Sequence, residues 1–182
     1  MSDNLAVDLR PIDFPGRDLV ARWLRTPAVS DWWGGAAVGE ARMRLAMTSD
    51  GAICRMVTLA GTPIGYGQGM DAAASGAPSA DLPPGSWECD LFIGEEAYRG
   101  KGIWSVAMDQ LVGEVLSTTL ALSCAVVVPI RNEPVARAAE RIGFRWTRIV
   151  AVPRDGPSWV MLRDRPQRGP WWSRRLRHGR DR

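Results

Sequence analysis

One stretch, residues 87–116, constrains the fold of this chain more than any other, because it places a strand, a glycine-rich turn and a helix in direct succession. In WECDLFIG, residues 87–94, alternate side chains share a face, as in a β-strand: one face is apolar throughout, and the other carries Glu88, Asp90 and Phe92. The turn YRGKGI, residues 98–103, leads into a helix to about residue 116 whose apolar residues recur at helical spacing. We therefore expect this helix to pack on the strand that precedes it.

The turn can be interpreted in two ways. Backbone N–H groups at a helix N-terminus that glycines open form an anion site, and a pyrophosphate is suited to it. Alternatively, Gly100 and Gly102 only permit a tight connection between strand and helix. The Arg-Gly-x-Gly pattern alone does not decide between the two.

The remaining segments predict one mixed sheet covered by helices, an α+β sandwich. Hydrophobic patterns predict strands at 5–10, 53–60, 63–69, 119–129, 144–152 and 158–163 and helices at 18–24, 37–47 and 133–142. Asn132 is expected to cap the last helix and Gly143 to end it. Residues 71–86, rich in Ala, Gly, Ser and Pro, predict a long loop, and such loops are often functional.

Length and composition favour a single domain, with a basic tail at its end. The chain has 182 residues, of which residues 1–163 are expected to form the domain and 164–182 the tail. Residues 163–182 contain eight arginines and two aspartates, whereas the rest of the chain has a net charge of −3. The tail interleaves tryptophans with arginines, which can suit nucleic acid or an anionic membrane, but a short unpatterned terminus favours a solvated tail. We expect neither partner.

Several classes of protein are disfavoured by what the sequence lacks. No apolar run reaches the ~18 residues that span a bilayer, and the N-terminus has no signal-peptide pattern, so a cytoplasmic location is expected. Cys54, Cys89 and Cys124 fit reduced, buried thiols. With His178 as the only histidine, neither a metal site nor a His-dependent triad is expected.

The motifs of this chain, taken together, resemble those of a known family. YRGKGI after WECDLFIG, followed by RNEPVARAAERIGF, resembles the GCN5-related N-acetyltransferase (GNAT) superfamily, whose signature is [Q/R]-x-x-G-x-[G/A]. DWWGG at 31–35, PIGYGQ at 63–68, DLFIG at 90–94 and DGP at 155–157 are similar to the aminoglycoside 6′-N-acetyltransferases and their siderophore-related relatives. The resemblance covers roughly residues 5–163 and implies the GNAT fold, with a central, mostly antiparallel mixed sheet flanked by helices.

The resemblance also implies a co-substrate, acetyl-CoA, and the residues that bind it. The turn would surround its pyrophosphate, Asn132 would contact its pantetheine or stabilise the following helix, and backbone N–H groups near residues 91–93 could stabilise the oxygen of the tetrahedral intermediate. The cofactor-binding residues so implied are Leu91, Phe92, Ile93, Arg99, Gly100, Lys101, Gly102, Ile103, Trp104, Ser105 and Asn132.

The implied acceptor site contains Trp33, Gln68, Asp90 and Asp155, with Asp81 as a further acceptor contact. Asp90 matches the carboxylate proposed as the catalytic base, and a carboxylate can take the proton that an ammonium must lose before it attacks a thioester. The alternative is a surface carboxylate on a half-exposed strand. For Trp32 and Trp33 we expect one core anchor and one wall of the acceptor site, with Trp33 at the site.

Three residues depart from the family pattern. Trp104 stands at the final Gly/Ala position of the signature, Ala139 where relatives have a tyrosine proposed to protonate the leaving thiolate, and Val127 where the subgroup has an aspartate. The Trp104 indole must either point away from the cofactor groove or fill part of it. An open groove predicts acetyl-CoA binding, and an indole over the turn amides predicts its loss.

The resulting hypothesis is an acetyl-CoA-dependent N-acetyltransferase that acts on a primary amine of a small polycationic acceptor, with aminoglycoside 6′-N-acetylation favoured. Attack would be direct, in a ternary complex, since no cysteine is placed as a nucleophile. Two alternatives stay open: a catalytically degenerate GNAT-fold ligand-binding or regulatory protein, and an enzyme that acts on a siderophore precursor or another amine. Relatives imply a monomer or a homodimer.

Overall fold

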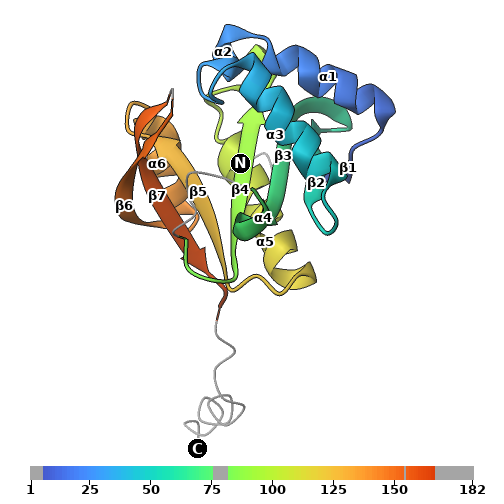
Figure 1. Ribbon diagram of the computed structural model, residues 1–182. Helices are drawn as coiled ribbons and strands as arrows, with labels where there is room; N and C mark the ends of the chain where they lie inside the picture. The colour runs from blue at the N-terminus through green and yellow to red at the C-terminus, as the bar shows by residue number, and fades with distance from the viewer. Residues whose placement is uncertain (1–5, 76–81, 154, 167–182) are drawn as a thin grey trace, which may run out of the picture.

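The computed structural model describes residues 6–75, 82–153 and 155–166 (Figure 1). In these residues, seven strands form one sheet in the order β1-β2-β3-β4-β5-β7-β6. The β4–β5 pair is parallel and the other pairs are antiparallel, which confirms the predicted mixed, mostly antiparallel sheet. The strands are β1 (Val7–Pro11), β2 (Ile53–Leu59), β3 (Thr62–Asp71), β4 (Ser86–Ile93), β5 (Ser123–Pro129), β6 (Arg145–Val152) and β7 (Gly156–Asp164).

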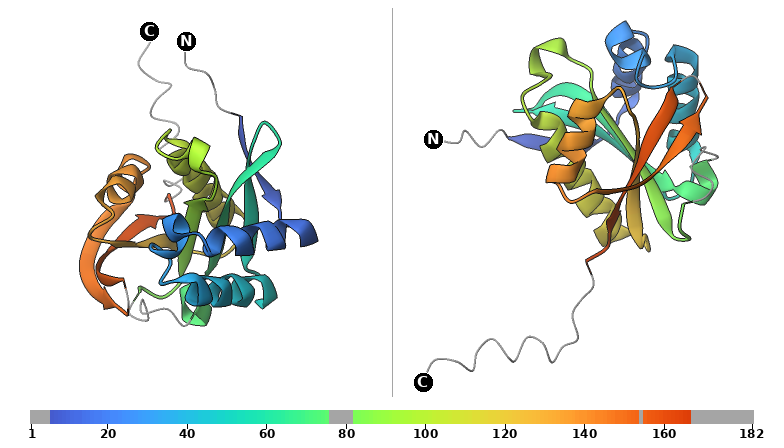
Figure 2. Two further views of the ribbon diagram at one scale, coloured as in Figure 1. Left: turned by 90° about the horizontal axis from the view of Figure 1, so that it is seen from above. Right: turned by 90° about the vertical axis from the view of Figure 1, so that its left-hand side faces the viewer.

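The helices cover both faces of the sheet, as Figure 2 shows. One face carries α1 (Phe14–Leu24), α2 (Pro27–Ser30) and α3 (Ala36–Thr48), and the opposite face carries α5 (Ile103–Thr118) and α6 (Glu133–Arg141). The short helix α4 (Ala72–Ser75) follows β3, and one 3-10 turn spans Glu96–Tyr98. Apolar side chains of α5 and the sheet form the larger core, and those of α1–α3 form a second core around Tyr66 and Phe92.

Several predicted boundaries were wrong, for identifiable physical reasons. Helix α1 begins before residue 18 because the Asp13 side chain accepts a hydrogen bond from the Gly16 N–H at 2.8 Å and caps it. Helix α5 continues to Thr118, so the following strand begins at Ser123 rather than 119. The segment expected to be one loop, 71–86, contains the end of β3, α4 and the start of β4.

Two predictions fall outside the part of the chain that the structure describes. Residues 76–81, which include Asp81, and residues 167–182, which form most of the expected basic tail, both lie there. The division of the chain at residue 163 stays a prediction. Among the described residues, no helix is both long and apolar enough to cross a membrane.

The sheet opens between its two parallel strands. β4 pairs with β5 only from Ser86 to Glu88, against Ser123 to Ala125, and the two strands diverge after that point. The indole of Trp23 packs against the end of β4, where a Cβ on Gly94 would lie 2.2 Å from the ring, so only glycine permits this approach. The divergence leaves backbone groups of β4 without a neighbouring strand and forms the floor of the candidate site.

Candidate active site

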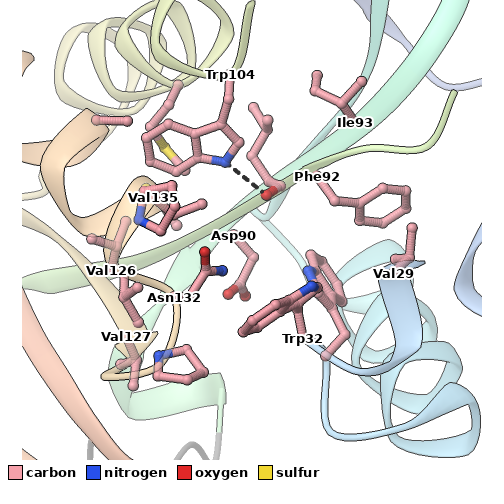
Figure 3. A pocket seen from close by; sticks show the side chains of 18 of the residues that line it. Val29, Trp32, Asp90, Phe92, Ile93, Trp104, Val126, Val127, Asn132 and Val135 are labelled. Carbon is pink, nitrogen blue, oxygen red and sulfur yellow. Dashed lines mark hydrogen bonds between the residues drawn. The ribbon is translucent and has the colours of Figure 1, made fainter. Parts of the chain in front are cut away.

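A cleft of about 700 Å³ lies over the gap between β4 and β5. Trp104, which follows the turn before α5, and Trp32, which follows α2, lie on opposite sides of it, with Asn132 and Asp90 between them (Figure 3), and the β6–β7 turn also lines it. Most of the residues predicted from the sequence line it: Trp33, Asp90, Leu91, Phe92, Ile93, Arg99, Gly100, Gly102, Ile103, Trp104, Ser105, Asn132 and Asp155. Gln68 and Lys101 do not.

The turn before α5 presents backbone N–H groups to the cleft. Gly100 and Gly102 have φ angles of 70° and 76°, which other residues rarely adopt, and Gly102 is the N-cap of the 16-residue helix α5. Within the described residues, the N–H groups of residues 100–104 donate no hydrogen bond. Unpaired N–H groups at a helix N-terminus, together with the helix dipole, attract an anion.

The two basic side chains of this turn are directed elsewhere. The Arg99 Nε donates to the Ile93 carbonyl at 3.0 Å, and an Nη of Arg99 also donates to the Gly94 carbonyl. Arg99 therefore fixes the turn to the end of β4. The Lys101 Nζ lies 5.9 Å from the centroid of the Tyr98 ring and outside the cleft. Apart from Ser105 and Arg141, which also line the cleft, the anion-binding groups that remain near this turn belong to the main chain.

The Trp104 indole lies in the gap between β4 and β5. Its Nε1–H donates to the Leu91 carbonyl at 2.9 Å, and Figure 3 shows this bond, with Trp104 and Asp90 on either side of the β4 ribbon. The ring therefore fills part of the groove, but the turn amides stay open. A strand residue directs its N–H and C=O to the same side, so the Leu91 N–H also faces the gap.

Asn132 stands at the N-cap position of α6, but its side chain makes no capping hydrogen bond, so the predicted cap was wrong. The side-chain amide instead projects into the cleft and faces Asp90 from the opposite wall (Figure 3). Pro134 and Glu133, which form the first turn of the helix, start it without a side-chain cap. Asn132 is thus available to a ligand in the cleft.

The Asp90 carboxylate is held by one oxygen. Its Oδ2 accepts from the Arg42 Nη2 at 2.7 Å and from the Gln68 Nε2 at 3.4 Å. The Oδ1 accepts no hydrogen bond from the described residues, and the Asp90 side chain keeps 14% of its surface exposed. Gln68, itself buried, also accepts from the Tyr66 hydroxyl at 3.0 Å, so it supports Asp90 from beneath rather than lining the cleft.

A second carboxylate, Glu88, lies two residues earlier on the same face of β4. Its Oε1 accepts from the same Arg42 Nη2 at 2.9 Å. Burial, and then the neighbouring Asp90 charge, raises the pKa of Glu88 to about 7, while Arg42 acts in the opposite direction. Burial also raises the pKa of Asp155 at the β6–β7 turn, against the opposing charges of Arg131 and Arg42.

The two tryptophans differ in burial in the opposite sense to that expected, although Trp33 lines the cleft as predicted. Trp33 is 6% exposed and packs edge-on against Phe92, with ring centroids 5.0 Å apart, so it is the core anchor. Trp32 is 37% exposed, and the Arg131 guanidinium stacks on its ring at 4.5 Å. Both line the cleft, and Trp32 offers the more open wall to an acceptor (Figure 3).

The other two departures from the family pattern have different consequences. Ala139 is fully buried in the core and does not line the cleft. Val127 lines the cleft from β5, where it presents an apolar surface opposite Asp90 (Figure 3). Neither residue supplies a polar group to the site.

Arg42 and Glu88 are site residues that were not predicted from the sequence. Arg42 lies three residues after Gly39 and four residues before Ala46, and both of these residues are buried on α3. Helical spacing therefore places Arg42 on the inward face of that helix. Glu88 shares the face of β4 with Asp90 because strand side chains alternate. A basic residue on a buried helix face and two acidic residues on one strand face were the available signal for this cluster.

Comparisons with known proteins identify the family of this chain. The family model of the acetyltransferase (GNAT) domain matches residues 16–152. The aminoglycoside N(6′)-acetyltransferase type 1 of Klebsiella pneumoniae is 26% identical over 179 residues, which cover 90% of this chain and 86% of the relative.

Solved structures share the fold. The crystal structure of the aminoglycoside acetyltransferase AAC(6′)-Ib in complex with coenzyme A has a TM-score of 0.75 and 24% identity, covering 88% of this chain and 95% of the other. An aminoglycoside N(6′)-acetyltransferase from Legionella pneumophila has a TM-score of 0.68 and 16% identity, covering 88% and 93%. These likenesses confirm the predicted fold class, and with the match over most of the domain they show that this chain belongs to the GNAT acetyltransferase family.

Proposed function

We propose that this chain transfers the acetyl group of acetyl-CoA to the 6′-amine of an aminoglycoside. One observation carries the proposal: a run of unpaired N–H groups at the start of α5 opens into the same cleft as the free Oδ1 of Asp90. Membership of the GNAT family supports the acetyl transfer. The names of the curated relatives, and the kanamycin complex of AAC(6′)-Ib, support the aminoglycoside as acceptor.

The residues at the turn fit the pyrophosphate of acetyl-CoA. The N–H groups of residues 100–104 lie in one turn at the positive end of a 16-residue helix dipole, which suits an anion of that size. The Leu91 N–H and the Asn132 amide line the path from the turn towards Asp90. When bound, acetyl-CoA supplies the acetyl group as a thioester.

At the other end of the cleft, called here the acceptor end, Asp90 binds the ammonium of the acceptor and removes its proton. The Asp90 Oδ1 accepts a hydrogen bond from the acceptor ammonium and takes its proton, directly or through a water. The freed amine attacks the thioester carbonyl carbon and forms a C–N bond; the nitrogen then loses its second proton to solvent, and the C–S bond breaks. Because Ala139 supplies no acid, solvent protonates the leaving thiolate.

Trp104 favours a second candidate function, a GNAT-fold protein that binds a ligand and has lost catalysis. The indole fills part of the groove in which acetyl-CoA would lie, and its N–H occupies the Leu91 carbonyl. The two candidates differ in one outcome, because only an enzyme releases coenzyme A thiol in the presence of an amine.

We further propose that the active enzyme is cytoplasmic and acts as a monomer or homodimer, without a nucleic-acid or membrane partner.

The test is thiol release from acetyl-CoA with two aminoglycosides that differ only in an amine or a hydroxyl at the 6′ position. We expect release with the 6′-amine and none with the 6′-hydroxyl. Equal release with both would show that the reacting amine is elsewhere. Release with neither, while acetyl-CoA still binds, would favour the non-catalytic candidate.

A further inference from the structure

The Arg42 guanidinium stands at the acceptor end of the cleft. It extends from α3 to β4, where its Nη2 donates to both Asp90 and Glu88, at 2.7 and 2.9 Å. The Arg42 side chain is 33% exposed, and its guanidinium carbon lies 5.6 Å from the centroid of the Trp33 ring. The charge of Asp155, which lies beside Gly34 just before the start of α3, also acts on it.

These bonds leave an unequal set of groups for an acceptor. Arg42 takes the Oδ2 of Asp90 and the Oε1 of Glu88, so the Asp90 Oδ1 is the carboxylate oxygen left open beside it. The Nε and Nη1 of Arg42 donate to no group in the described part of the chain. The cluster therefore offers an acceptor for one ammonium and, next to it, N–H donors that suit a hydroxyl or ether oxygen.

The net charge of this end points the same way. Glu88, Asp90 and Asp155 line it together with Arg42, so its net charge is −1 with Glu88 protonated and −2 with Glu88 ionised. With Glu88 protonated, a single ammonium neutralises this charge. A second ammonium close to the first would lie beside the guanidinium, and this juxtaposition of like charges is unfavourable.

We propose that Arg42 is a specificity-determining residue, which selects acceptors whose reacting ring carries one ammonium with a hydroxyl beside it over rings that carry two ammonium groups. The inference rests on the proposed acetyl transfer to aminoglycosides and narrows it to a class of acceptor. Arg42 does not touch the reacting atoms. It acts by repelling the second cation and by donating to the hydroxyl that takes its place.

The competing interpretation gives Arg42 a structural role alone, as an ion pair that ties α3 to β4. The two interpretations predict different effects of substitution. Loss of a purely structural ion pair lowers activity with every acceptor by the same factor. Loss of a charge-selecting residue changes the ratio of kcat/KM between acceptors of different charge.

The experiment compares two aminoglycosides that differ at one position of the reacting ring, which is not itself acetylated. One carries a hydroxyl there and the other carries an amine. The wild-type protein, Arg42→Lys, Arg42→Gln and Arg42→Gln with Glu88→Gln are assayed for kcat/KM by thiol release and for binding by calorimetry. The double variant removes one charge of each sign, so it avoids leaving two neighbouring carboxylates without a cation. Circular dichroism confirms that each variant is folded.

We expect the wild-type protein and Arg42→Lys to prefer the hydroxyl-bearing acceptor. Arg42→Gln and the double variant should shift the ratio towards the diamine by about tenfold. An unchanged ratio, or a wild-type preference for the diamine, would overturn the inference. If no acceptor is turned over, the proposed function fails; the binding ratio then decides the inference on its own, and equal ratios in wild type and Arg42→Gln overturn it.

Discussion

At the end of the cleft near the start of α5, called here the cofactor end, the backbone N–H groups of residues 100–104 are free to bind a ligand, while the side chains of Arg99 and Lys101 are engaged elsewhere. At the acceptor end the available groups are charged and aromatic side chains from α3, β4 and the β6–β7 turn. Main-chain groups persist through substitution, whereas each side-chain group changes with its residue. The cofactor end can therefore stay constant while the acceptor end acquires a new specificity.

The largest effect should come from the acceptor end. Asp90→Asn keeps the shape of the side chain but removes the base, so kcat should fall about 10²–10⁴-fold. Affinity for acetyl-CoA should stay within about twofold, because the turn amides do not contact Asp90. Thiol release and calorimetry measure the two quantities.

The control for Asp90→Asn is Asp109→Asn, which alters a surface ion pair with Arg163. It should leave both the rate and the affinity as in the wild type. An Asp90→Asn variant with an undiminished rate would exclude Asp90 as the base.

The next effect concerns the stability of the acceptor end. The pKa of Glu88 is raised to about 7 from its ordinary 4.5, so the folded state holds the Glu88 proton more tightly than the unfolded state. Its contribution to folding is thus complete below pH 4.5 and is lost as the pH rises through 7. That loss corresponds to about 3 kcal/mol, and Glu88→Gln should abolish it.

Urea unfolding of wild type and Glu88→Gln at several pH values between about 5 and 8 measures the difference in the free energy of unfolding. Glu133→Gln, in an exposed ion pair with Arg137, is the matched control and should follow the wild type. A constant difference between wild type and Glu88→Gln across this range would mean that Glu88 does not titrate there.

Substitution of Trp104 tests whether a side chain also determines acetyl-CoA affinity at the cofactor end. Trp104→Ala frees the Leu91 carbonyl and the space between β4 and β5, so acetyl-CoA should bind up to about tenfold more tightly, which is about 1.4 kcal/mol. Trp104→Phe keeps a ring in the groove and should change the affinity less. Weaker binding by Trp104→Ala would show that the indole is a wall on which the cofactor packs.

The smallest effects separate main chain from side chain at the turn. Lys101→Ala removes a charge that lies outside the cleft, and the affinity for acetyl-CoA should change by less than about threefold. Gly102→Ala should weaken binding more, because alanine at a φ of 76° costs about 1 kcal/mol and displaces the turn. If the order of the two effects were reversed, the cofactor end would depend on side-chain charge.

The same difference between the two ends explains how far the sequence could be interpreted. The strand–turn–helix unit was predictable because alternation, glycines and helical spacing are local patterns, whereas the family fold was implied by the resemblance of its motifs. Arg42, Glu88 and the roles of the two tryptophans were not, because they depend on which side chains meet across α3, β4 and the β6–β7 turn. Asn132 was correctly predicted to stand at the N-cap position of the last helix, but its side chain lines the cleft and does not cap the helix.

The most direct test of this account is a calorimetric titration of acetyl-CoA into the wild-type protein and Asp90→Asn. The account predicts saturable binding at micromolar concentrations, with the same affinity in both proteins, because the main-chain amides at the start of α5 do the binding. Undetectable binding by the wild-type protein would contradict it, since the Trp104 indole would then close the groove.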